Sequence, residues 1–300
     1  MSDGVQDLLT GMSNALAERA RLARPLVVKL SARGHRERSG TLWRKDVVIA
    51  SEQGFPDVGE ATVTLADGST LAARVTGRDA ATNVVALRLD GGPESAPVPA
   101  AEPQAGRLVL AFGAAEEGVS VRLGVVHSVG PAWHSRAGGR IDRRIILDIS
   151  LGHREEGGPV LDAGGGLLGM STLGPRRSVL VIPSATVDGV IEPLLSTGRV
   201  ERGWLGVALQ PIHLPEALQT VAGQSRGLVI MGISKDGPAS RAGVQVGDIL
   251  LSVGGESVAS PIAVAQRLGP DSVGQQIELR LIRAGAPQML QATVGVRPPR

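Results

Sequence analysis

The sequence contains no cysteine, which excludes disulfide bonds and thiolate metal sites. It has no tyrosine, two phenylalanines and three tryptophans, so a core must be built from Val, Leu, Ile and Ala. Its apolar runs are all shorter than the roughly 18 residues that a membrane-spanning helix needs. Lysine occurs at only three positions, and the arginines that supply the remaining positive charge are spread along the chain. This dispersal argues against a nucleic-acid-binding surface, which needs clustered positive charge.

The 300 residues suggest about two domains, and 41 glycines with 19 prolines fit a globular protein rich in strands and turns. Residues 1–23 lack the basic and then apolar profile of a secretory signal. If residue 1 is the natural start, a cytoplasmic location is therefore expected.

Apolar residues recur at three- and four-residue spacing between Val5 and Leu22, which predicts an amphipathic helix that Pro25 ends. Short apolar segments separated by turn residues follow, a pattern typical of β-barrels. Strands of a first barrel are expected at residues 25–31, 40–43, 46–50, 61–65, 71–76 and 84–89. A linker at 91–106 leads to a second set at 108–112, 119–129, 144–150, 167–171 and 179–182.

The stretch His153–Asp162 (HREEGGPVLD) lies between two of these expected strands. Its Gly-Gly-Pro run makes a tight reversal, because Gly adopts positive φ and Pro fixes φ. Such a turn holds the preceding side chain, here Glu156, over a pocket. The stretch resembles the nucleophile loop of trypsin-like serine proteases, and with its flanks that of the HtrA/Deg family, in which the catalytic serine precedes Gly-Gly-Pro.

Two further segments resemble the same family. Residues 47–55 (VVIASEQGF) resemble the strand and turn that carry the catalytic histidine, which places Gln53 at that position. Residues 79–88 (DAATNVVALR) resemble the segment that carries the catalytic aspartate, which places Asn83 there. The resemblance implies a trypsin-like fold of two β-barrels.

Serine-protease chemistry needs a nucleophile, a base and an anion that orients the base. The Gln53 amide cannot accept a proton near neutral pH, Asn83 carries no charge, and the Glu156 carboxylate is a poor acyl nucleophile that opposes an oxyanion. We therefore predict no functional catalytic residue at these positions and a chain that is not an enzyme. Shifting the alignment does not restore a triad, because only Ser, Glu and Gly adjoin the histidine position and the five histidines lie elsewhere.

Other chemistries at this stretch find little support. Glu155 and Glu156 are adjacent carboxylates, but neighbouring residues in a turn point apart, unlike a proton-sharing dyad. His153 with nearby acidic residues lacks a recognised zinc-site spacing, so no metal or other cofactor is predicted. The remaining interpretation is that Glu156 hydrogen-bonds to loop amides and to Gln53 and closes the pocket.

The last third of the chain resembles a PDZ domain of the HtrA type, on Asp236–Gly243 (DGPASRAG) and Val246–Val253 (VGDILLSV). The run from Trp204 to Val207 resembles the loop whose amides receive a peptide carboxylate, and a helix at 260–268 is expected to flank the groove. Leu205 and Val207 fit core packing equally well. The predicted peptide-binding residues are Trp204, Leu205, Gly206, Val207, Val264 and Leu268, which imply a preference for apolar C-terminal residues.

The expected fold is mainly β: a helix over 1–24, a trypsin-like double six-stranded β-barrel over 25–198, and an α+β PDZ domain of the circularly permuted HtrA type over 199–300. The expected function is that of a catalytically inactive HtrA-like homologue that binds protein C-termini or exposed peptide segments as a scaffold, regulator or holding factor. The alternatives are an active HtrA-like serine endopeptidase in protein quality control and a non-catalytic subunit of an active paralogue. A homotrimer is a further possibility, because the N-terminal helix either mediates contacts between subunits or folds onto its own barrel.

Overall fold

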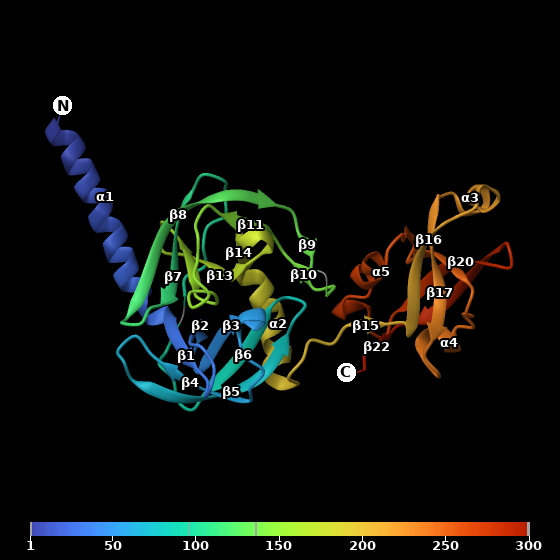
Figure 1. Cartoon of the computed structure of the whole chain (residues 1–300), viewed down its shortest axis with the longest axis horizontal. Coiled ribbons are helices and arrows are strands. Elements are labelled where there is room, and N and C mark those ends of the chain that lie inside the picture. Colours follow the sequence, from blue (N-terminus) through green and yellow to red (C-terminus); the bar gives the residue numbers. More distant parts are fainter. Residues whose placement is uncertain (1, 96, 136, 299–300) are drawn as a thin grey trace. The chain divides into compact units, whose positions relative to one another are not determined.

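The computed structural model describes residues 2–95, 97–135 and 137–298. The chain divides into two compact units, each described by itself below. The barrel unit comprises Met1–Trp133 with Ile141–Val200, and the C-terminal unit comprises His134–Arg140 with Glu201–Arg300. Figure 1 shows both units and labels most of their helices and strands. No helix in the described ranges is long and apolar enough to span a membrane.

Six antiparallel strands close the first barrel in the order β1-β2-β3-β6-β5-β4. Its interior is filled by aliphatic side chains and one aromatic ring, including the fully buried Leu30, Val48 and Leu87. The strands are β1 (Val27–Ser31), β2 (Arg38–Arg44), β3 (Val47–Ser51), β4 (Glu60–Thr64), β5 (Thr70–Asp79) and β6 (Val84–Leu89), with the 3₁₀ turn η2 (Glu52–Gly54) after β3.

The second barrel closes in the order β11-β14-β13-β12-β7-β8. Its strands are β7 (Leu108–Ala114), β8 (Val119–Gly130), β11 (Arg144–Leu147), β12 (Pro159–Asp162), β13 (Leu167–Leu173) and β14 (Val179–Pro183). The short pair β9 (Trp133–His134) and β10 (Arg140–Ile141) lies outside the barrel, and the 3₁₀ turn η3 (Pro175–Arg177) joins β13 to β14.

A shared core joins the two barrels within their unit. Ile49 of the first barrel, Phe112 and Met170 of the second, and Leu194 of helix α2 (Ser184–Ser196) belong to one cluster and are fully buried. Burial of each such side chain stabilises the fold by about 1.5–3 kcal/mol. The loops that carry Gln53, Asn83 and Glu156 are therefore anchored on one packed core that both barrels share.

The predicted N-terminal helix is confirmed as α1 (Ser2–Ala23), followed by the 3₁₀ turn η1 (Arg24–Leu26) that contains Pro25. Only its second half contacts the barrel core, through Leu16, Ala20 and the buried Ala23. The apolar side chains of its first half stay exposed, and Figure 1 shows this part of α1 extending away from the barrels. These exposed residues are Val5, Leu8, Leu9 and Met12.

The C-terminal unit is built on a sheet with the path β16-β17-β18-β20-β21, with the short β19 paired to β18 and a separate pair β15-β22. Its strands are β15 (Gly203–Trp204), β16 (Val207–His213), β17 (Arg226–Ile233), β18 (Ile249–Val253), β19 (Glu256–Ser257), β20 (Gln276–Arg283), β21 (Ala286–Thr293) and β22 (Gly295–Val296). Its helices are α3 (Glu216–Ala222), α4 (Pro238–Arg241) and α5 (Pro261–Arg267), with the 3₁₀ turn η4 (Pro270–Ser272). Because β16 lies at the edge of the sheet, its outer side is open to pairing.

The mainly β fold with two six-stranded barrels is confirmed, with local differences from the sequence expectations. The strand expected at 144–150 ends at Leu147, and β12 was not expected as a strand. Helix α5 ends at Arg267, so Leu268 follows the helix instead of belonging to it. Strand β21 and helix α3 were also missed.

Candidate functional site

The Gly-Gly-Pro reversal before β12 requires both glycines. Gly157 has φ +96°, and a Cβ there would collide with the carbonyl oxygen of Ser39. A Cβ on Gly158 would collide with the carbonyl oxygen of Phe112. The strained turn expected from the sequence is therefore confirmed, and it sets the position of the residue ahead of it, Glu156.

The Glu156 side chain is buried, with 4% of its residue surface exposed, and one of its oxygens accepts four hydrogen bonds. The donors to Oε1 are Ser51 Oγ at 2.8 Å, Gln53 Nε2 at 2.7 Å, Thr172 Oγ1 at 2.8 Å and the Leu173 N–H at 3.2 Å. Buried charges persist in folded proteins when donors of this kind satisfy them. The expected contact between Glu156 and Gln53 is present.

Asn83 completes the same cluster from the turn between β5 and β6. Its backbone has φ +60°, a left-handed conformation that Asn tolerates better than most residues. Its Oδ1 accepts the Gln53 N–H at 2.8 Å, and its Nδ2 donates to Thr172 Oγ1 at 2.7 Å. The buried Asp79 shapes this turn by accepting from the Thr82 hydroxyl at 2.6 Å. The structure therefore brings all three triad-position residues, Gln53, Asn83 and Glu156, together.

Two hydroxyl residues of this cluster were not identified from the sequence. Ser51 ends β3, and Thr172 lies in β13; both are buried, at 2% and 3% exposure. Nothing in the local sequence of Thr172 marks it, because its role depends on the pairing of the second barrel. Ser51 lies two residues before Gln53, and its polar side chain at the end of an otherwise apolar strand was the available signal.

The neighbouring carboxylate, Glu155, points to other partners. It accepts two hydrogen bonds from Arg122, each at 2.9 Å, and one from the Gly152 N–H at 2.7 Å. Burial raises the pKa of the Glu155 carboxyl, but the bonds from Arg122, Gly152 and Ser120 outweigh burial and bring that pKa below its usual value. The expectation that adjacent carboxylates point apart is confirmed, and Glu155 anchors the loop that carries Glu156.

Chemically, this cluster consists of a carboxylate, two amides and two hydroxyls. Because the Ser51 and Thr172 hydroxyls donate to Glu156, the carboxylate is placed to take a proton from either one, an arrangement found in nucleophile–base pairs. Among the described residues, no group of three or more His, Asp or Glu side chains is placed to hold a metal ion.

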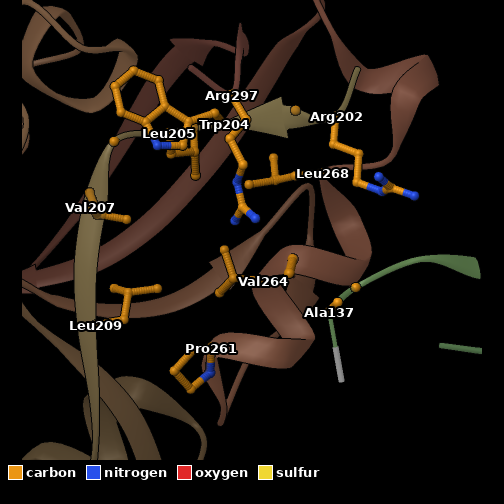
Figure 2. A pocket seen from close by; sticks show the side chains of 14 residues that line it. Ala137, Arg202, Trp204, Leu205, Val207, Leu209, Pro261, Val264, Leu268 and Arg297 are labelled. Carbon is orange, nitrogen blue, oxygen red and sulfur yellow. The ribbon is translucent and has the colours of Figure 1, made fainter. Parts of the chain in front are cut away.

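A second candidate site is a groove in the C-terminal unit, with a cavity of about 150 Å³ between β16 and α5. All six predicted peptide-binding residues line it, as do Leu209 and Pro261 (Figure 2). Leu205, Val264 and Leu268 are also part of the buried core of the unit. For Leu205, packing and lining of the groove are therefore combined in one residue.

The loop at one end of the groove presents backbone donors. Its carbonyls face inward, because Leu205 O accepts the Ala239 N–H at 2.9 Å and Gly206 O accepts the Ser234 N–H at 2.8 Å. In the described part of the chain, the N–H groups of Leu205 and Gly206 have no acceptor. Gly206 has φ +77°, and a Cβ there would lie 3.1 Å from the Trp204 indole. The positive φ at Gly206 and the nearby indole favour glycine at the centre of this loop.

Two arginines, Arg202 and Arg297, line this groove. Sequence reasoning did not identify either of them. Residues 134–140 belong to the same unit, and Ala137 and Gly138 also contribute to the lining. Burial lowers the pKa of His134, and the nearby positive charges of Arg140 and Arg267 lower it further.

Comparison with known proteins finds matches to both units of the chain. Residues 38–170 match the family model of the trypsin-like peptidase domain, and residues 229–283 match that of the PDZ domain. A serine endoprotease from Yersinia pestis has the same architecture, with a TM-score of 0.74 over 94% of this chain and 98% of that one at 26% identity. The HtrA-type protease AlgW with a decapeptide superimposes with a TM-score of 0.74 over 96% of this chain and 99% of that one, at 23% identity. The fold is that of the HtrA-type proteases.

Curated relatives are similar along most of the chain. A probable periplasmic serine endoprotease, DegP-like, from Brucella suis is 28% identical over 87% of this chain and 52% of its own length. Its counterpart from Pseudomonas putida is 29% identical over 89% of this chain and 59% of its own length. The chain thus spans just over half the length of these relatives, and the matches support the HtrA family.

These findings contradict two sequence-based expectations. The prediction that the chain is not an enzyme is wrong, because the HtrA-type relatives are named serine endoproteases. That prediction rested on three side chains, whereas the comparison of the whole chain points to an enzyme. The expected cytoplasmic location is also wrong, because the curated relatives are named periplasmic proteins, which points to export. The prediction of a cytoplasmic location was based on the missing basic and apolar profile in residues 1–23, which does not determine the location.

Proposed function

We propose that this chain is an HtrA-like endopeptidase of protein quality control that captures protein C-termini or exposed peptide segments in the groove of its PDZ domain. The observation that carries the capture part of this proposal is a pair of N–H groups, of Leu205 and Gly206, for which the described residues offer no acceptor, at the end of an apolar groove. Two backbone donors without acceptors match the two oxygens of a peptide carboxylate.

The strand beside the groove supports the same mode of binding. Strand β16 is the edge of its sheet, so an extended peptide adds to it through main-chain hydrogen bonds. Val207 and Leu209 on this strand and Val264 on α5 form apolar walls for the peptide's side chains. Peptides that end in Val, Leu, Ile or Ala are therefore the expected ligands.

Capture is tested with the full chain and a fluorescein-labelled peptide that ends in valine, compared with the same peptide amidated at its C-terminus. Fluorescence anisotropy should report that amidation weakens binding by more than tenfold, which corresponds to about 1.4 kcal/mol. A peptide of the same composition with an acidic last residue serves as the specificity control. Equal affinities for the free and amidated peptides would contradict capture of the carboxylate.

Cleavage of captured segments is the second part of the proposal, and the names of the relatives support it. The hydroxyls next to the Glu156 carboxylate, those of Ser51 and Thr172, are the nucleophiles that the cluster offers. Because both are buried, acylation of either requires that the loop carrying Glu156 move.

Cleavage is tested with unfolded casein and a fluorophosphonate probe, after removal of host proteases. If the wild type is labelled, one of two variants, Ser51→Ala or Thr172→Val, should lose labelling, and the variant that does so identifies the nucleophile. Ser69→Ala, which removes a hydroxyl from an exposed turn, is the control and should keep labelling. If the wild type neither cleaves casein nor takes up the probe, the endopeptidase part is refuted and peptide capture stands alone.

A further inference from the structure

Arg297 lies beside the carboxylate-receiving loop although it is distant from it in sequence. Strand β22 pairs with β15, so Val296 is opposite Gly203 and Gly295 is opposite Trp204. The Arg297 N–H then donates to the Arg202 carbonyl at 3.0 Å, which extends this pairing by one step. The backbone of Arg297 is therefore fixed next to the loop.

The Arg297 side chain points into the groove. Figure 2 shows its guanidinium toward Val264 and Leu268, which line the same pocket. An arginine over apolar walls keeps its stem in contact with them and presents its charged end to a ligand.

The charge of Arg297 is not compensated within the described part of the chain. Two other arginines of this unit have carboxylate partners: Arg267 pairs with Glu256 at 3.2 Å, and Arg283 pairs with Asp248 at 2.8 Å. No described carboxylate pairs with Arg297, and the described residues that line the groove include two arginines and no acidic residue. The groove therefore presents a positive charge next to its apolar pocket.

We propose that Arg297 makes this groove selective for peptides with an acidic side chain at one of the two positions before an apolar C-terminal residue. The inference rests on the proposed capture of peptides. The terminal carboxylate goes to the N–H groups of Leu205 and Gly206, which leaves the guanidinium for a second carboxylate. A planar guanidinium binds a carboxylate through two parallel hydrogen bonds, which fixes direction as well as charge.

The test uses the full chain and labelled peptides that end in the same valine and differ in one residue, Glu, Gln or Lys, at either of the two preceding positions. At one of these positions, the wild type should bind the Glu peptide about fivefold to tenfold more tightly than the Gln peptide, and the Lys peptide least. Arg297→Gln should remove this preference while leaving affinity for the Gln peptide within about twofold. Arg297→Glu should reverse the order of the Glu and Lys peptides.

Arg226→Gln is the matched control, because it removes the same charge at the start of β17, among residues that do not line the groove. It should leave the preference for the Glu peptide intact. If Arg297→Gln weakens all peptides equally, the side chain only packs or binds the terminal carboxylate, and the inference is wrong. It is also wrong if the wild type binds Glu and Gln peptides equally. If no peptide with a free C-terminus binds at all, it is the proposed capture itself that fails.

Discussion

Replacement of Glu156 by alanine tests whether this carboxylate holds the polar cluster together. Two of its four donors, Ser51 and Gln53, have other acceptors within the cluster. The Thr172 hydroxyl keeps only a longer contact, to Ser51 Oγ at 3.3 Å, and the Leu173 N–H loses the acceptor described above. A buried donor without an acceptor costs about 1–3 kcal/mol, so the free energy of unfolding of the barrel unit should fall by about 2–4 kcal/mol. Glu156→Gln keeps the accepting oxygen and loses only the charge, so it should cost about 1 kcal/mol.

Differential scanning calorimetry of the full chain measures this effect in the transition of the barrel unit. For a unit of this size, the alanine variant should lower Tm by about 6–12 °C and the glutamine variant by about 3 °C. Glu117→Ala removes an exposed carboxylate from the same unit and should change stability by no more than about 0.5 kcal/mol. The reasoning is refuted if Glu156→Ala melts like the wild type, or if the glutamine and alanine variants are equally damaging.

Three further predictions concern the loops of the two sites. Gly206→Glu should abolish peptide binding in the anisotropy assay, because its positive φ and the close Trp204 ring exclude a side chain and the new charge repels a carboxylate; retained binding would contradict the assigned loop. Gly157→Ala should lower the free energy of unfolding of the barrel unit by at least about 2 kcal/mol, measured by the same calorimetry, because its φ is positive and its Cβ would meet backbone. The lowered pKa of Glu155 stabilises the fold above the ordinary carboxyl value of 4.5, and this contribution is lost as pH falls through the folded pKa. Tm measured against pH should therefore fall less steeply in acid for Glu155→Gln, whereas an unchanged slope would show that the Arg122 pair contributes nothing.

Much of the fold follows from local patterns in the sequence. The spacing of apolar residues in α1 and the alternation of strands and turns in the first barrel are local signals, and the elements match them. Strand β12 escaped prediction because it is only four residues long and begins with Pro159, which is compatible with a strand only at its first position. The shorter β11 has a similar cause, since the chain leaves the barrel after Leu147 to form the loop that carries Glu156.

The candidate sites were predictable where short sequence motifs mark them. Gln53, Asn83 and Glu156 were placed by alignment with three separate segments, and all three belong to one hydrogen-bonded cluster. Their contacts to Thr172 depend on the pairing of strands distant in sequence, which no local pattern encodes. Arg297 likewise enters the groove only because β22 returns to β15, so its role follows from tertiary structure.

The scarcity of aromatic residues gives the groove a built-in optical probe. Trp204 is the only tryptophan between residues 201 and 300, and the chain has no tyrosine. This indole lies against Gly206, in the loop proposed to receive the peptide end. The other two indoles, Trp43 and Trp133, lie in the barrel unit, where Trp43 donates to Asp188 at 2.8 Å. Phenylalanine at those two positions leaves a chain with a single emitting side chain at the groove. Its emission then follows the arrival of an unlabelled polypeptide in real time.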